Sequence, residues 1–143
     1  MAAGVGALAV LTAAGAVALP ASITAAGGGA GVRATAASCP LGASFSPSRG
    51  DPSRLRVRFS VRGFRPGHPV YLHYLAPGRH LALTVGLGFA SGRCGTLTSS
   101  RRRLFPFRRL AVGDWRLQFD TQGRYHRRPS RPFVVLLVPV LRR

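Results

Sequence analysis

The feature that most constrains the fold of this chain is a strict alternation of polar and apolar side chains over residues 54–62. In RLRVRFSVR an apolar residue recurs at every second position, and each residue between is Arg or Ser. A period of two is typical of a β-strand, because successive strand side chains point to opposite faces, whereas a helix repeats every 3.6 residues. The sequence therefore predicts a strand with one buried face and one arginine-rich face.

Turn signals divide the chain beyond this strand into further short segments. The glycines and proline of 63–67 predict a turn, and Ala76-Pro77-Gly78-Arg79 predicts a second turn of type II geometry. The strands expected around these turns cover residues 69–75, 81–87, 94–98, 104–107, 113–121 and 133–141. About seven short strands without an amphipathic helix predict an all-β chain folded as a β-sandwich.

Two apolar segments carry more specific expectations. Residues 133–141 (FVVLLVPVL) are apolar throughout, which favours a strand buried on both faces, and Pro139 restricts the end of that strand to an edge or a bulge. The segment 104–107 (LFPF) is expected to plug one end of the sandwich, and exposure to a partner or a membrane is the alternative. Aromatic side chains would supply much of the core. The candidates are Phe59, Trp115, Phe119 and Phe133.

The N-terminal segment differs in composition from the rest of the chain. No charged side chain occurs from Met1 to Val32, and the apolar run 5–19 has the length of a signal-peptide core. Cleavage after Ala26 or Ala36 fits the small-x-small rule, and the second site is favoured. A membrane anchor remains an alternative, because no Arg precedes the run and the 19 residues 5–23 are marginally long enough to span a bilayer. We expect residues 1–37 to be a signal peptide or N-terminal anchor, 38–53 a first strand and loop, and 54–143 the sandwich.

The chain has two cysteines, Cys39 and Cys94. An even number in a small exported domain favours a disulfide, and closing a loop of this length stabilises by roughly 4 kcal/mol. Two buried free thiols in a cytosolic protein are the alternative. There is no C-x-x-C motif and no Cys/His pair at ligand spacing, so zinc is not expected.

The charge of the chain is strongly one-sided. All 21 basic residues are Arg, the acidic residues are three Asp, and the formal net charge is +18. Outward arginines of the first strand would lie about 6.8 Å apart, a spacing comparable with phosphates along an extended polyanion. The candidate anion-binding residues are Arg54, Arg56, Arg58, Arg62, Arg101, Arg102, Arg103 and Arg116. The alternative interpretation is a solvated face whose arginine stems cover apolar area.

Tyr71 and His73 alternate with the inward residues of the strand at 69–75. Beside Arg116 and Gln118 of a neighbouring strand they would form an aromatic platform for a base or a sugar. The alternative is that Tyr71 is there only as a good strand former. If the strands carrying them pair, His73 would also approach Asp120.

The sequence offers little for catalysis. No G-x-S-x-G elbow presents a serine, no carboxylates are paired for acid–base work, and no glycine loop follows a strand to hold a phosphate. The four histidines, at positions 68, 73, 80 and 126, lack metal-ligand spacing. We therefore expect no enzyme activity, no metal and no cofactor, and no small-molecule substrate is evident.

Two short motifs carry a resemblance to a known family. Residues 61–70 (VRGFRPGHPV) resemble the GF-x-PG-x-x-V strand–turn–strand of bacterial Ig-like modules, and residues 111–117 (AVGDWRL) resemble a late strand of those modules. Residues 54–143 as a whole resemble exported Ig-like β-sandwich proteins of high-GC actinobacteria. The resemblance implies an Ig-like fold and export, and it brings no catalytic or binding residue.

The sequence thus predicts a non-catalytic, exported module, extracellular or in the cell envelope, that associates electrostatically with an anionic polymer or membrane surface. An intracellular or membrane-anchored nucleic-acid-binding protein is one alternative, and a structural module without a ligand is another.

Overall fold

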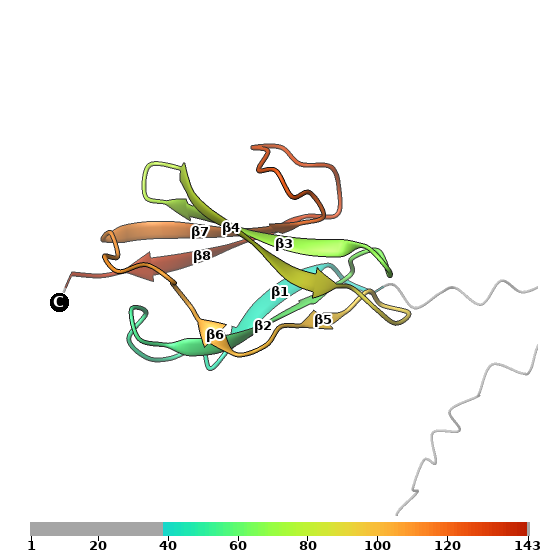
Figure 1. Cartoon of the computed structure of the whole chain (residues 1–143), viewed down its shortest axis with the longest axis horizontal. Coiled ribbons are helices and arrows are strands. Elements are labelled where there is room, and N and C mark those ends of the chain that lie inside the picture. The colour runs from blue at the N-terminus through green and yellow to red at the C-terminus, as the bar shows by residue number, and fades with distance from the viewer. Residues whose placement is uncertain (1–38, 143) are drawn as a thin grey trace, which may run out of the picture. The chain divides into compact units, whose positions relative to one another are not determined.

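The computed structural model describes residues 39–142 (Figure 1), so the predicted signal peptide or anchor over 1–37 lies outside the described residues. The described part of the chain is all-β. Its strands are β1 (Gly42–Ser46), β2 (Arg56–Arg62), β3 (Pro69–Ala76), β4 (His80–Phe89), β5 (Leu97–Thr98), β6 (Arg102–Arg103), β7 (Gly113–Asp120) and β8 (Val134–Val140). None of the residues from 39 to 142 forms a helix that could cross a membrane.

The strands form two antiparallel sheets that lie face to face (Figure 1). The first sheet has the order β1-β2-β5, with β6 pairing a different part of β2, and the second has the order β4-β3-β7-β8. This arrangement confirms the predicted all-β sandwich. The turn between β3 and β4 is also as predicted, because Gly78 has φ 86° and the Arg79 N–H donates to the Ala76 carbonyl at 2.9 Å.

The core lies between the sheets and follows the alternation of β2. Val57 and Phe59 are fully buried, whereas Arg56 and Arg58, which alternate with them, are exposed. Phe59 meets Phe119 of β7 edge-on, with ring centroids 5.8 Å apart. Leu104 and Phe105 are buried, which confirms that this segment serves the core. Trp115 and Phe119 are also buried as predicted.

Three sequence predictions about this region were wrong. Residues 104–107 form no strand, because the pairing with β2 ends at Arg103 and the following side chains turn into the core. Strand β8 is buried on one face only: Val138 and Val140 belong to the core, whereas Leu137 on the outer face is 64% exposed. Phe133 precedes β8 and is only half-buried. Pro139 does lie on an edge strand, as its missing N–H requires.

The predicted disulfide is present and ties the beginning of the domain to the first sheet. Cys39 and Cys94 have Cα atoms 5.3 Å apart, and the bond encloses 55 positions of chain. The Cys94 carbonyl accepts a hydrogen bond from the N–H of Gly63 at 2.8 Å. A Cβ on Gly95 would overlap the carbonyl oxygen of Phe64, so only glycine permits this close passage of two backbone segments.

Candidate anion-binding faces

The outer face of the first sheet carries an open line of arginines. Arg56, Arg58 and Arg62 are exposed on β2, and the register places Arg103 of β6 directly opposite Arg56. These four residues are called the arginine row below. Arg54 precedes β2, in a turn where its N–H donates to the Asp51 carbonyl at 3.0 Å, and Arg101 is exposed before β6. The alternation of β2 therefore places charge where the sequence predicted it.

The pairing of Arg56 with Arg103 sets two positive side chains opposite each other across an antiparallel ladder. Such partners have Cβ atoms about 4.5–5.5 Å apart, and like charges at this position destabilise the sheet. An anion lying between the two guanidinium groups would cancel the repulsion. The fold thus opposes two like charges at this point of the ladder.

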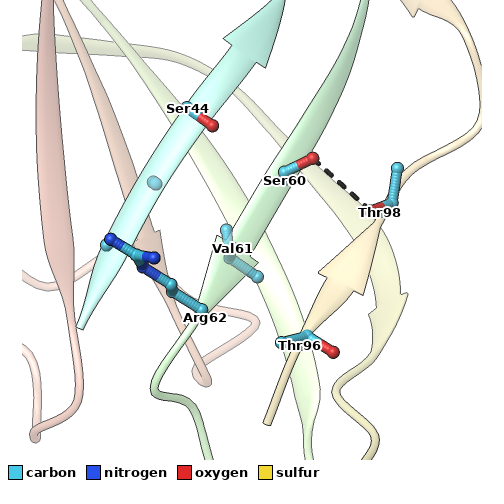
Figure 2. A pocket seen from close by; sticks show the side chains of 8 residues that line it. Ser44, Ser60, Val61, Arg62, Thr96 and Thr98 are labelled. Carbon is cyan, nitrogen blue, oxygen red and sulfur yellow. Dashed lines mark hydrogen bonds between the residues drawn. The ribbon is translucent and has the colours of Figure 1, made fainter. Parts of the chain in front are cut away.

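A hollow lined by hydroxyl groups interrupts the arginine row (Figure 2). The register aligns Ser44 of β1, Ser60 of β2 and Thr98 of β5 across the sheet, and the Ser60 and Thr98 hydroxyl oxygens are 3.4 Å apart. The hollow has a volume of about 410 Å³, and Arg62 lies at its edge. Hydroxyls can donate hydrogen bonds to phosphate oxygens, so the hollow places neutral donors between Arg58 and Arg62.

Arg102 does not belong to this exposed face. Its register partner is the buried Val57, its side chain is half-buried, and its Nε is buried without a hydrogen-bond partner in the described chain. Burial raises the pKa of the nearby Tyr74 hydroxyl, and the positive charge of Arg102 partly offsets that rise. Among the candidate residues of 101–103, Arg102 therefore lies on the opposite face from Arg103, because successive residues of a strand point to opposite faces.

Part of the outer face of the second sheet is covered by the long connection between β7 and β8, residues 121–133 (Figure 1), called the covering loop below. His73 and Asp120 are fully buried beneath it, and Gln118 is 4% exposed. The prediction that His73 stands on an exposed aromatic platform was therefore wrong. Tyr71 is half-buried, and its ring packs within van der Waals distance of the site where Gly123 of the loop would carry a Cβ.

The buried side chains form a hydrogen-bond network centred on Asp120. Its Oδ1 lies 3.1 Å from His73 Nε2, as sequence reasoning anticipated for paired strands, and accepts the Gln122 N–H at 2.8 Å. Its Oδ2 accepts the Gln118 side-chain N–H at 2.9 Å, and the same nitrogen donates to the His126 carbonyl at 3.0 Å. The network ties the covering loop to the sheet.

The proton of His73 is placed by its neighbours. Nε2 faces both the Asp120 carboxylate and the Gln122 carbonyl at 3.1 Å, and a carbonyl can only accept, so Nε2 carries the hydrogen. Nδ1 lies 2.7 Å from the Thr84 hydroxyl of β4, which donates to it in the neutral ring. All these partners lie inside the domain, which makes the network an anchor for the loop.

A cleft opens at the border between the covering loop and the sheet. It has a volume of about 310 Å³. Its lining residues are Leu75, Arg79, Arg116, Gln118, Tyr125, Arg127, Arg128, Phe133 and Val135. Sequence reasoning named Arg116 alone among the anion-binding candidates here, because the other arginines come from two other segments that only the fold brings together.

The described residues include no group of three or more His, Cys, Asp or Glu side chains placed to hold a metal ion. Both candidate sites are cationic. The arginine row lies open on the first sheet, and the arginines of the second sheet line a cleft. Comparisons of the chain with protein-family models, with curated proteins and with solved structures found no match, so both faces are interpreted from their own chemistry.

Proposed function

We propose that this protein is a non-catalytic, exported module of Ig-like type that binds an extended anionic polymer of the cell envelope. The binding surface is the outer face of the first sheet. The observation that carries the proposal is the arginine row, with Arg56 and Arg103 opposed across the ladder and the hydroxyl hollow between Arg58 and Arg62.

The shape of this surface favours a polymer. The seven residues of β2 extend over roughly 20 Å at about 3.4 Å per residue, and the exposed arginines recur along that length. Guanidinium groups bind phosphate oxygens in pairs of parallel hydrogen bonds, and the hydroxyls between them add neutral donors. An extended phosphodiester or acidic glycan chain would contact several of these groups at once.

The overall charge supports the same proposal. With a formal net charge of +18, the chain has far more arginines than its three aspartates can neutralise, and Asp120 is used inside the domain. Such an excess attracts polyanions over distances up to about a Debye length. The Cys39–Cys94 disulfide fits an oxidising compartment outside the cytosol.

The test of polymer binding is affinity for a glycerol-phosphate polymer measured against salt concentration. We expect the affinity of the disulfide-bonded protein to fall steeply with salt. The triple variant Arg56→Gln/Arg58→Gln/Arg62→Gln should bind at least about tenfold more weakly and show a shallower salt slope. The matched control Arg65→Gln/Arg93→Gln/Arg142→Gln removes the same charge from exposed positions elsewhere. Equal losses of affinity in the two triple variants would mean that net charge, and not the arginine row, determines binding.

Two further arms separate the other functions that the sequence left open. Tighter binding to single-stranded RNA than to the glycerol-phosphate polymer at equal salt would favour a nucleic-acid-binding protein. An absence of saturable binding to either polymer would leave a structural module without a ligand. Export is tested by the intact mass of the protein secreted from a GC-rich host. We expect the mass of a chain that begins near Ala37, and we expect it to increase by two hydrogens on reduction.

A further inference from the structure

The cleft beside the covering loop is not used by the proposed polymer-binding face. We propose that this cleft binds a compact organic phosphate, with the phosphate held by Arg79, Arg116, Arg127 and Arg128 and the organic part against an apolar wall. This inference goes beyond the proposed function, since the two sites lie on opposite outer faces of the sandwich (Figure 1).

The positive charge of the cleft is not neutralised within residues 39–142. None of the four guanidinium groups has a hydrogen bond or an ion pair with a described residue. Asp114 lines an adjoining hollow together with Arg79 and Arg116, but it pairs with neither. The buried Asp120 accepts a hydrogen bond from Gln118 of the cleft lining, so two carboxylates lie near four guanidinium groups and the concave site keeps an excess of positive charge. Arg is the side chain best suited to bidentate phosphate binding.

Two of the arginines are held in place by the sheet. Arg116 is half-buried on β7, with Leu75 of β3 and Leu137 of β8 as its register partners. Arg79 has φ 65°, the left-handed conformation that non-glycine residues seldom adopt. Arg at this position adds a side chain to the lining of the cleft at the cost of some backbone strain.

The other two arginines extend from the anchored part of the covering loop. The His126 carbonyl is held by Gln118, and the Tyr125 ring packs edge-on against His73 with centroids 5.6 Å apart. Arg127 and Arg128 follow directly in the chain. The buried network therefore pre-positions these charges, which lowers the ordering cost of binding.

The remaining lining defines the class of ligand. Leu75, Phe133 and Val135 form an apolar wall, which an inorganic anion would leave in contact with water. A volume of about 310 Å³ is at the small end of ligand pockets and fits a group of sugar-phosphate size better than a length of polymer. A phosphate monoester carries about two negative charges at neutral pH, enough to engage several arginines. Its source is either a free sugar phosphate or the phosphorylated end of a polymer.

The experiment is calorimetric titration of the disulfide-bonded protein with glucose 6-phosphate, and with inorganic phosphate for comparison. We expect one saturable site for glucose 6-phosphate and weaker binding of inorganic phosphate. Arg116→Gln should weaken binding at least about tenfold, while Arg56→Gln, with the same change in charge on the other sheet, should not. The pair Arg127→Gln/Arg128→Gln alters only exposed loop residues and serves if Arg116→Gln is unfolded by circular dichroism.

Equal loss in Arg56→Gln and Arg116→Gln, or no saturable binding, would overturn the cleft proposal. Polymer binding is scored separately with a glycerol-phosphate polymer that lacks a terminal phosphate, so either proposal can fail while the other stands. A polymer that carries the terminal monoester distinguishes the two sources. If that polymer displaces glucose 6-phosphate and the one without it does not, the cleft binds polymer ends. If neither displaces it, the cleft binds a free sugar phosphate.

Discussion

The outer faces of the two sheets have similar strand patterns and opposite environments. On the first sheet the outward side chains of β2 are exposed arginines. On the second sheet the outward side chains His73, Gln118 and Asp120 are buried under the covering loop. A polar residue at an outward strand position therefore carries charge to solvent in one place and holds a loop in the other. The difference arises because the covering loop packs on the second sheet, and the alternation of residues in a strand does not predict this.

The two sheets are also stabilised by different chemistry: the first is linked to the start of the domain by the disulfide, and the second holds the covering loop through hydrogen bonds. The largest expected effect concerns the disulfide. Replacing both cysteines, Cys39→Ser/Cys94→Ser, removes the closure of 55 positions of chain. We expect the free energy of unfolding to fall by roughly 4 kcal/mol, because the unfolded chain regains the entropy that the crosslink removed. Urea unfolding measures this. Under native conditions the amides of the first sheet should lose more hydrogen-exchange protection than those of the second, and an equal or larger loss around His73 would contradict the division.

The second prediction breaks the fastening of the second sheet. Asp120→Asn keeps one side-chain oxygen and replaces the other with an NH2 group that faces the side-chain nitrogen of Gln118. That nitrogen is itself a donor and already donates to the His126 carbonyl, so two donors would face each other. We expect a loss of about 2–3 kcal/mol in urea unfolding. Proteolysis after Arg124 or Arg127 should become faster. Asp114→Asn removes the same charge from an exposed position and should change stability by less than about 0.5 kcal/mol.

Tyr74 sharpens the contrast between satisfied and unsatisfied buried polar groups. Its hydroxyl lies in the shared core without a hydrogen-bond partner in the described chain, unlike the side chains around Asp120. Tyr74→Phe is therefore expected to leave stability unchanged or to raise it by about 1 kcal/mol. A loss above about 1 kcal/mol would show that the hydroxyl is satisfied.

The same residue gives a pH dependence. Burial raises the Tyr74 pKa in the folded protein, so above pH about 10 the unfolded state loses a proton that the folded state keeps. Stability should then decline as the pH rises past the unfolded value, and less so in Tyr74→Phe. The chain has no lysine to complicate this range. Urea midpoints measured at pH 8 and pH 11 for both proteins provide the comparison.

The smallest expected effect tests the open face. Arg103→Gln removes one of the two like charges opposed in the β2–β6 ladder. Without polyanion we expect a gain of about 0.2–1 kcal/mol in unfolding free energy, reduced at high salt. Arg101→Gln, exposed but outside the ladder, is the matched control. Equal changes in the two variants would mean that net charge matters and the register does not.

The strand pattern of β2, β3 and β7 was predictable from sequence because alternation depends only on the two-residue repeat of an extended chain. The disulfide was predictable because the chain offers a single pair of cysteines. The burial of strand β8 was misread, since a continuous apolar run does not distinguish a strand buried on both faces from one with an exposed outer face. The inward turn of Arg102 was missed for a similar reason, because two-residue strands are too short to show a period.

The sequence by itself determined the all-β class, the faces of β2, β3 and β7, the crosslink and the excess of positive charge, because each depends on composition or on local periodicity. The tertiary structure alone decided the register that opposes Arg56 to Arg103 and the burial of His73 and Asp120. It also gathered Arg79, Arg116 and Arg127–Arg128 around one cleft. These features join residues distant in the chain, and their positions follow from strand order and from the path of a loop that no local pattern specifies.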